Sequence, residues 1–108
     1  MAQDSVKAFP LSSLASASVT ANYAALNPNG FPAAPFYFRI VNASNMAITV
    51  SYDGVTDNEV VLANSVFPLE SQTNSQPNAR VALFPKLTVV YIKGTAGAGT
   101  IYLSGYYV

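Results

Sequence analysis

The residues that could do chemistry are few, and the densest group is three carboxylates within seven residues. Asp53, Asp57 and Glu59 make up three of the five acidic residues of the chain. Clustered carboxylates can bind hard cations such as calcium, and paired carboxylates can hydrolyse sugars. The spacing does not match an EF-hand loop, and nothing in the sequence brings Asp4 or Glu70 to a working distance. We therefore interpret the group as a solvated turn that Asp53 opens, and predict neither a metal site nor a catalytic pair.

The chain also lacks the side chains on which most enzymes depend, because it contains no histidine and no cysteine. These absences exclude disulfides, thiol chemistry, most zinc sites and the Ser-His-Asp triad. A serine or threonine nucleophile would need Lys7, Lys86 or Lys93 as its base, and all three fit better as charges at strand edges. We predict that the protein is not an enzyme and binds no cofactor.

Two short motifs resemble known sites, and both have simpler interpretations. Residues 94–100 form a glycine-rich run, but a phosphate-binding loop needs a Lys-Ser or Lys-Thr pair after its last glycine and then a helix. A turn between two strands explains this run better. Asn42-Ala43-Ser44 matches the N-glycosylation pattern, but no basic and apolar export signal opens the chain, so we interpret the match as chance.

Length and charge limit the class of protein and its partners. The 108 residues suffice for one domain. Five lysines and arginines cannot form a basic face for nucleic acid. Pro, Asn and Ser interrupt every apolar run, so no segment approaches a membrane-spanning helix. We expect synthesis in a cytoplasm without export, no nucleic-acid partner and no contact with a membrane.

Apolar and polar residues alternate along most of the chain, which is the period of a β-strand. No segment has the apolar stripe of a helix, and turn residues separate the alternating segments. We predict a single antiparallel β-sandwich over residues 14–108, jelly-roll-like or alternatively immunoglobulin-like, preceded by an N-terminal arm over residues 1–13. The expected strands are 15–23, 36–41, 46–52, 59–62, 66–70, 80–84, 86–93 and 100–108.

The same alternation assigns residues to the core. Segment 86–93 is apolar on both faces, so we expect a central strand that is buried on both sides and forms a hairpin with 100–108. Pro68 places its strand at the edge of a sheet, since proline cannot donate to a ladder. The expected core residues are Phe38, Ile40, Ile48, Val50, Val61, Leu83, Leu87, Val89, Tyr91, Ile101 and Leu103.

The surface is poor in charge. Charged residues make up 9% of the chain, against roughly 25% in an average soluble domain. The net charge is zero, so no colloidal repulsion keeps copies apart. We therefore expect a homo-oligomer or larger assembly that covers part of this surface. The expected contacts are the N-terminal arm, the polar loop 71–78 and the residues Pro28, Phe31, Pro32, Pro35, Tyr102, Tyr106 and Tyr107.

Aromatic residues offer the largest apolar side chains of this sequence, which has seven tyrosines and six phenylalanines. Three of the tyrosines crowd the last strand. Such rings could pack in the core, anchor a subunit interface or stack on sugars. The residues alone leave these three alternatives open.

Two stretches resemble a known family of proteins. ITVSYDGVTD (48–57) and VVYIKGTAGAGTIYLSGY (89–106) are similar to small virion proteins that tailed bacteriophages encode among their head and neck genes. These are β-sandwich proteins of the decoration, cement or adaptor kind. The resemblance implies a non-enzymatic structural role, symmetric oligomers and binding to the major capsid protein or other virion proteins.

The resemblance favours a protein that decorates or cements the capsid and resides in the virion. One alternative is a neck, tail or baseplate adaptor, which would differ in its copy number. Another is a carbohydrate- or receptor-binding module, which would need an exposed aromatic platform beside polar groups.

Overall fold

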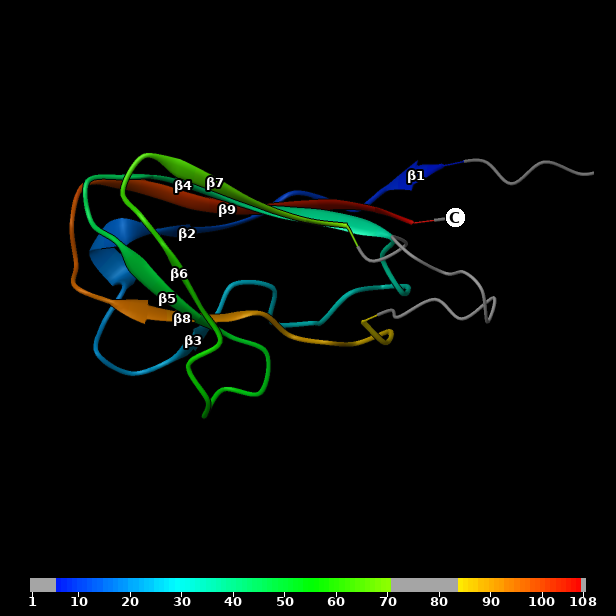
Figure 1. Cartoon of the computed structure of the whole chain (residues 1–108), viewed down its shortest axis with the longest axis horizontal. Helices are drawn as coiled ribbons and strands as arrows, with labels where there is room; N and C mark the ends of the chain where they lie inside the picture. The colour runs from blue at the N-terminus through cyan, green and yellow to red at the C-terminus, as the bar shows by residue number, and fades with distance from the viewer. Residues whose placement is uncertain (1–5, 71–83, 108) are drawn as a thin grey trace, which may run out of the picture.

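The computed structural model describes residues 6–70 and 84–107. In these residues nearly all regular structure is β-strand, arranged in two antiparallel sheets that lie face to face (Figure 1). The helical structure of this part of the chain is a short 3-10 turn at Ser16–Ser18. The prediction of an all-β sandwich without a long helix is confirmed.

The larger sheet is built around β9, which pairs with β4 over eight residues. Its order is β1–β9–β4–β7, and β2 follows β1 along the same side of β9. This puts β7 at an edge, as Pro68 predicts. The strands are β1 (Lys7–Ala8), β2 (Ser12–Ala15), β4 (Tyr37–Ser44), β7 (Ser65–Glu70) and β9 (Gly99–Tyr107).

The smaller sheet has the order β3–β8–β5–β6. Its strands are β3 (Ala24–Ala25), β5 (Ile48–Ser51), β6 (Glu59–Val61) and β8 (Tyr91–Gly94). If the strands are counted along the chain with β2 as the first, the order across the larger sheet is 1-8-3-6. The order across the smaller sheet is 2-7-4-5. This is the strand order of a jelly roll, so the jelly-roll-like prediction is confirmed and the immunoglobulin-like alternative is not needed.

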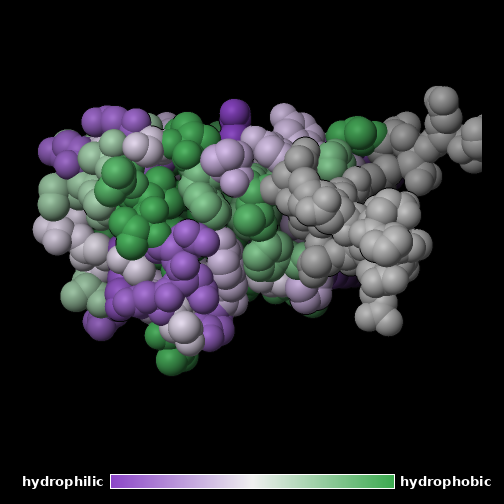
Figure 2. Space-filling view, viewed as in Figure 1, coloured by the Kyte–Doolittle hydropathy of each residue, from purple (hydrophilic) through white to green (hydrophobic). Residues whose placement is uncertain are grey.

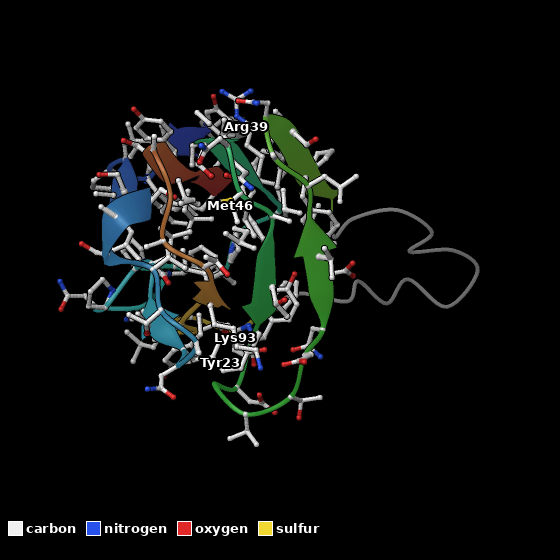
Figure 3. The ribbon with its side chains drawn as sticks, turned by 90° about the vertical axis from the view of Figure 1, so that its left-hand side faces the viewer. Tyr23, Arg39, Met46 and Lys93 are labelled. Atoms are coloured by element: carbon white, nitrogen blue, oxygen red, sulfur yellow. The ribbon has the colours of Figure 1, made fainter. Side chains whose placement is uncertain are left out.

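The strand order gives the sandwich two distinct sides. β6 and β7 are consecutive edge strands that contact each other. They form one side, the β6–β7 side. The other side, the β2–β3 side, carries the opposite edges of both sheets. Figure 3 views the sandwich from one end and separates the two sides, with β6 and β7 on the right and the N-terminal strands on the left.

The core lies between the sheets and follows the alternation of the central strands. In β4 and β9 every second residue is buried. Two further core residues are Val90, which directly precedes β8, and Ile92 within β8. The confirmed core predictions are Phe38, Ile40, Ile48, Val50, Val61, Ile101 and Leu103.

A buried polar residue links the sheets. Asn42 of β4 is fully buried, and its amide nitrogen donates to the carbonyl oxygens of Met46, Val61 and Leu62 at 2.9–3.2 Å. The hydroxyl of Ser44 donates to its side-chain oxygen. Because buried polar groups cost stability unless they are paired, this set of bonds fixes the start of the β4–β5 connection and the end of β6 against β4.

The prediction for 86–93 is wrong. β8 begins only at Tyr91, and the buried residues before and within it are Val90 and Ile92, so the assigned register is off by one residue. Leu87 is exposed and has a positive φ of 72°, which lies outside the β region for a residue with a side chain. β8 and β9 lie in different sheets, so they form no hairpin and residues 95–98 cross between the sheets.

Two other predictions need correction. Residues 15–23 are not one strand, because β2 ends at Ala15 and the chain turns through Ser16–Ser18 before β3. Alanine and serine have low strand propensity, so alternation alone does not hold this segment extended. Residues 7–8 and 12–13 of the expected arm pair with β9. Of the expected strand 80–84, residues 80–83 with the expected core residue Leu83 lie outside the described residues, and Phe84 is not in a strand.

Candidate functional site

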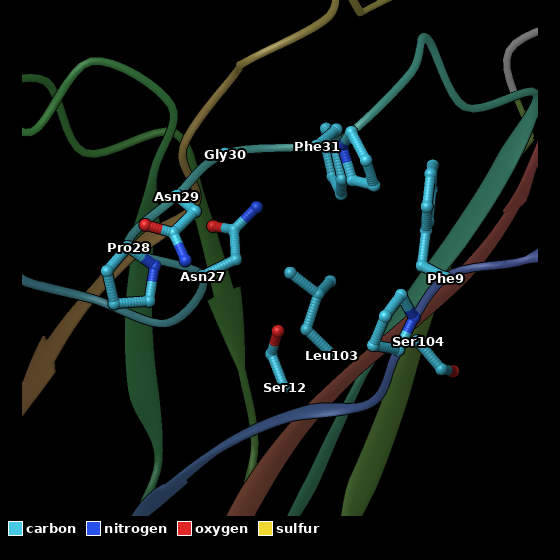
Figure 4. Close-up of a pocket in the computed structure, with 11 residues that line it drawn as sticks. Phe9, Ser12, Asn27, Pro28, Asn29, Gly30, Phe31, Leu103 and Ser104 are labelled. Carbon is cyan, nitrogen blue, oxygen red and sulfur yellow. The ribbon is translucent and has the colours of Figure 1, made fainter.

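A cleft opens on the β2–β3 side, between the larger sheet and the proline-rich loop that follows β3 (Figure 4). Its volume is about 290 Å³. Residues of β2 and β9 form one wall and the loop forms the other. The lining residues are Phe9, Pro10, Ser12, Asn27, Pro28, Asn29, Gly30, Phe31, Pro32, Leu103 and Ser104.

The loop wall is held in place by bonds to residues 87–90. The buried side chain of Asn27 accepts from the backbone N–H of Val90 at 2.7 Å and donates to the carbonyl of Thr88 at 3.3 Å. The N–H of Phe31 donates to Thr88, and its carbonyl accepts from Leu87 at 2.8 Å. One asparagine side chain and a short backbone ladder thus fix the loop, which is therefore preorganised to bind.

Gly30 is the residue at which the loop and residues 87–90 approach most closely. Its φ is +75°, and its N–H closes a turn onto the carbonyl of Asn27 at 2.8 Å. A Cβ at Gly30 would lie 2.5–2.6 Å from backbone atoms of Leu87. Only glycine combines this conformation with this contact, so the wall of the cleft depends on it.

A row of stacked rings forms the end of the cleft. The ring of Phe9 stacks on Tyr107 at 4.9 Å and on Phe31 at 5.4 Å, and Phe31 contacts Phe38 in the core. The N–H of Phe9 donates to the carbonyl of Gly105, and a Cβ at Gly105 would lie 2.9 Å from the Phe9 ring. This row ties the N-terminal segment to the larger sheet and to the loop that follows β3.

The lining of the cleft suits binding rather than acid–base chemistry. None of its lining residues, all of which the structure describes, has a titratable side chain. Its polar groups are the hydroxyls of Ser12 and Ser104 and the amides of Asn27 and Asn29, among apolar rings and prolines. Such a lining holds a partner by apolar contact with a few hydrogen bonds.

The structure separates the predicted contact residues. Pro28 and Pro32 are exposed at the cleft, whereas Phe31 and Pro35 are buried within the chain. Phe31 is buried because it fills the space between Phe9 and Phe38. The sequence gives no sign of this, since a phenylalanine between glycine and proline in a loop looks exposed.

The three tyrosines of β9 do not form one group: Tyr102 and Tyr106 share a face but are four residues apart, and Tyr107 points to the opposite face. Tyr106 is exposed and its ring lies 6.1 Å from that of Tyr37. Tyr107 stacks on Phe9 and is half-buried, as is Tyr102. Tyr106 is thus the predicted tyrosine with the most surface to offer a partner.

The β6–β7 side carries an apolar patch that the sequence analysis did not single out. Val60, Leu62 and Val66 are 61%, 65% and 53% exposed. We call these three residues the apolar edge. Figure 2 shows green, hydrophobic side chains gathered where β6 and β7 face the viewer. The sequence contained a signal for this patch, because three successive apolar residues at 60–62 cannot all point from one strand into the core of the protein. Val61 points inward, and its two neighbours are exposed.

The carboxylate group is a turn, as predicted. Asp53 accepts hydrogen bonds from the backbone N–H groups of Val55 and Thr56 at 2.8 Å and from the hydroxyl of Ser51 at 2.7 Å. These bonds hold the pKa of Asp53 far below its usual value. Within residues 6–70 and 84–107, no group of three or more acidic side chains could hold a metal ion.

Asp57 belongs to a separate polar cluster at β3 and β8. It accepts a hydrogen bond from the hydroxyl of Tyr23 and pairs with Lys93 at 3.0 Å, and these contacts lower its pKa. The Lys93 ammonium lies 4.6 Å from the centre of the Tyr23 ring. Desolvation and the hydrogen bond to Asp57 raise the pKa of Tyr23 to about 12. The cluster fastens the 53–58 loop to β8, and Figure 3 labels Tyr23 and Lys93 side by side.

Comparisons with known proteins give a fold but no family. No family model matches the chain, and no curated protein matches it. A solved structure of the Bacillus endospore appendages, described as disulfide-linked pili, is similar over 99% of this chain and 91% of its own, with 15% identity and a TM-score of 0.52. The Dit protein of phage SPP1, described as a hub of the adsorption apparatus, has 15% identity and a TM-score of 0.44, and this chain spans 50% of it.

The first of these similarities indicates a shared β-sandwich fold. The present chain has no cysteine, so it forms no disulfides. No helix in the described residues is long and apolar enough to cross a membrane.

Proposed function

We propose that the protein is a structural subunit of a tailed-bacteriophage virion and acts by non-covalent contacts with other virion proteins. In this role it decorates or cements the capsid, binds the major capsid protein and forms homo-oligomers. It has no catalytic activity, and it contacts neither nucleic acid nor membrane. The same surfaces would also serve a neck, tail or baseplate adaptor, which is the alternative we retain.

The observation that carries the proposal is the apolar edge on a surface with few charges. Val60, Leu62 and Val66 each expose more than half of their side-chain surface. A patch of this kind on a protein with no net charge favours self-association or binding to another protein. Covering it within an assembly removes apolar surface from water, at about 25 cal/mol per Å².

Two further features support a binding role. The cleft has no titratable lining residue, which fits contact better than catalysis. The jelly roll is a fold of viral capsid proteins and of lectins. Because a fold alone does not decide function, this feature supports the proposal only together with the apolar edge and the sequence resemblance.

Locating the protein in purified particles tests the proposal. Virions of the phage that encodes the chain are analysed by mass spectrometry and cryo-electron microscopy. We expect the protein in the particle at a copy number set by capsid symmetry, with density over joints between capsid subunits. A few copies at the neck or tail would favour the adaptor alternative. Absence from the virion would refute both.

A second experiment tests whether the apolar edge makes the contact. Particles lacking the protein are incubated with the wild type or with Leu62→Glu/Val66→Glu, and bound protein is measured after sedimentation. We expect the double variant to bind at least about tenfold more weakly, because two charges enter a desolvated contact. Val55→Glu is the matched control, since Val55 is 82% exposed on the 53–58 loop. Equal binding of all three proteins would contradict the proposed contact.

The carbohydrate alternative is tested on the same material. Tyr37 and Tyr106 lie close together on the larger sheet and would be the aromatic platform. A glycan array with wild type and Tyr106→Ala would show binding that depends on this ring if sugars are the ligand. We expect no binding above background.

A further inference from the structure

We infer that a second copy of this chain covers the apolar edge: the β6–β7 side of one copy packs against the cleft on the β2–β3 side of the next. The inference rests on the proposed function for its setting, because it names one partner in the proposed assembly. It assigns a heterologous, head-to-tail contact rather than a two-fold one. The cleft of one copy therefore covers the apolar edge of its neighbour.

The placement of the two features favours this arrangement. The cleft and the apolar edge lie on opposite sides of the sandwich, at the first and last strands of each sheet. A two-fold contact would bring edge against edge and would leave the cleft empty. A head-to-tail contact uses both surfaces in every copy, and it closes a ring or extends a filament according to the rotation between copies.

The size and lining of the cleft suit side chains. At about 290 Å³ it lies just below the range for small-molecule sites, which is roughly 300–1,000 Å³. Its walls are mainly rings and prolines, and Leu11 and Leu87 add exposed apolar surface nearby, one just before β2 and one against Gly30. Val60, Leu62 and Val66 are the exposed aliphatic side chains of the opposite side.

Strand direction is also compatible with a head-to-tail contact. All neighbouring strands are antiparallel, and each sheet is four strands wide from one side to the other. β7 therefore runs opposite to β2, and β6 opposite to β3, so a copy added in the same orientation places antiparallel edges together in both sheets. Pro68 lacks an N–H in β7, so we assign the contact to side-chain packing rather than to a continuous ladder.

The charges of the two sides are complementary. Lys7 in β1 precedes Phe9 of the cleft, and Lys86 precedes Leu87, which bonds to Phe31. No carboxylate lies among the cleft residues, which are all described. The β6–β7 side presents Glu59 at the start of β6, and residues 59–69 contain no lysine or arginine. Two copies joined edge to edge would bring like charges together, whereas a head-to-tail contact brings opposite charges together.

Two variants that each disable one surface test the inference. Leu62→Glu/Val66→Glu charges the apolar edge. Ser12→Arg fills the cleft from β2, where Ser12 lies opposite Leu103 and faces the same way. We expect the wild type to self-associate in analytical ultracentrifugation, and each variant to do so at least about tenfold more weakly. A mixture of the two variants should form a one-to-one dimer that does not grow, because one intact edge meets one intact cleft.

Matched controls separate the contact from the fold. Val55→Glu places a charge on an exposed valine away from both surfaces, and Ser13→Arg places the same arginine on the other face of β2. Both should associate like the wild type, and circular dichroism and melting should show all variants folded. If Ser12→Arg fails to fold, Pro32→Arg on the exposed loop wall takes its place.

Three results would overturn the inference. The first is a wild type that stays monomeric at millimolar concentration. The second is a cleft variant that associates as well as the wild type, since the contact would then be edge to edge. The third is a mixture of the two variants that stays monomeric. If the wild type is monomeric but its edge variant no longer binds particles, the edge binds another virion protein, and the proposed function stands without this inference.

Discussion

The β4–β9 pair and the segment 84–90 both carry apolar residues into the core, but different bonds hold them there. β4 and β9 pair over eight residues, and alternate side chains point inward along the whole length. Segment 84–90 forms no strand and is held by Asn27, by backbone bonds to Phe31 and by the close contact with Gly30. The pair is thus fixed by a repeating ladder, and the segment by a few specific contacts that also shape the cleft.

This difference predicts how each region fails. Loss of a side chain in the β4–β9 pair should cost stability throughout the protein, because β1, β2 and β7 pair with it and the smaller sheet packs on it. Loss of a contact at 84–90 should loosen the cleft wall first. Local and global unfolding have separate free energies, so the two kinds of damage can be measured separately.

The largest effect is expected for Ile40→Ala in β4. Ile40 is fully buried between the sheets, and such truncations cost about 2–5 kcal/mol because they leave a cavity. Denaturant unfolding measures the change in the free energy of unfolding. Val41→Ala is the control, because Val41 lies on the outer face of the same strand and is only half-buried. Equal losses for both variants would mean that the assigned faces of β4 are wrong.

The next largest effect is expected for Asn27→Ala. Its removal leaves the N–H of Val90 buried without its partner, which costs about 1–3 kcal/mol. Hydrogen exchange should rise at residues 88–90 and at Phe31 before it rises in β4 or β9. Asn29→Ala is the control, since Asn29 is exposed on the same loop. Uniform loss of protection across the protein would place 84–90 in the same cooperative unit as the central pair.

A third, smaller effect distinguishes the two registers of 86–93. Val90→Ala removes two buried methyl groups, at about 0.8 kcal/mol for each buried carbon. Val89→Ala should cost less, because Val89 is partly exposed. The measurement is again the free energy of unfolding of both variants. A larger loss for Val89 would restore the register predicted from the sequence.

These comparisons also explain how far sequence could lead. In β4 and β9 the inward residues Ile40 and Ile101 have polar neighbours, such as Arg39 beside Ile40, so the alternation correctly predicted both as core residues. In residues 87–92 both alternating sets of side chains are largely apolar, so alternation cannot decide whether Val89 or Val90 points into the core. The choice is made by the bond between Asn27 and Val90, two residues that are 63 positions apart. No local pattern contains that information.

The candidate site was predictable only in part, for the same reason. Proline stiffness pointed to Pro28 and Pro32, which do lie exposed at the cleft. The opposite wall comes from β2 and β9, which meet the loop only in the folded chain. The apolar edge follows from residues 60–62 once β6 is known to be an edge strand, and strand order is a tertiary property.

The smallest effect concerns Asp57, which fastens the 53–58 loop to β3 and β8 and lies away from both regions compared above. The hydroxyl of Tyr23 and the ammonium of Lys93 stabilise the carboxylate and lower its pKa. A lowered pKa contributes stability above the ordinary value of about 3.9 that is lost as the pH falls through the folded value. Asp57→Asn should therefore be slightly less stable than wild type at neutral pH, and this difference should vanish in acid.

The tyrosine partner gives the sharper readout of the same cluster. Desolvation and Asp57 raise the pKa of Tyr23 to about 12, whereas burial and Glu59 raise that of Tyr52 to about 12. Because the folded chain then holds these protons above pH 10, stability falls as the pH rises through that range. The pH titration of tyrosinate absorbance in Asp57→Asn should show the pKa of one tyrosine returning toward about 10, while the pKa of Tyr52 stays high. The variants Tyr23→Phe and Tyr52→Phe show which titration belongs to which tyrosine. An unchanged titration would mean that Asp57 does not bond to Tyr23 in solution, and the contact of Asp57 with β8 would then rest on Lys93.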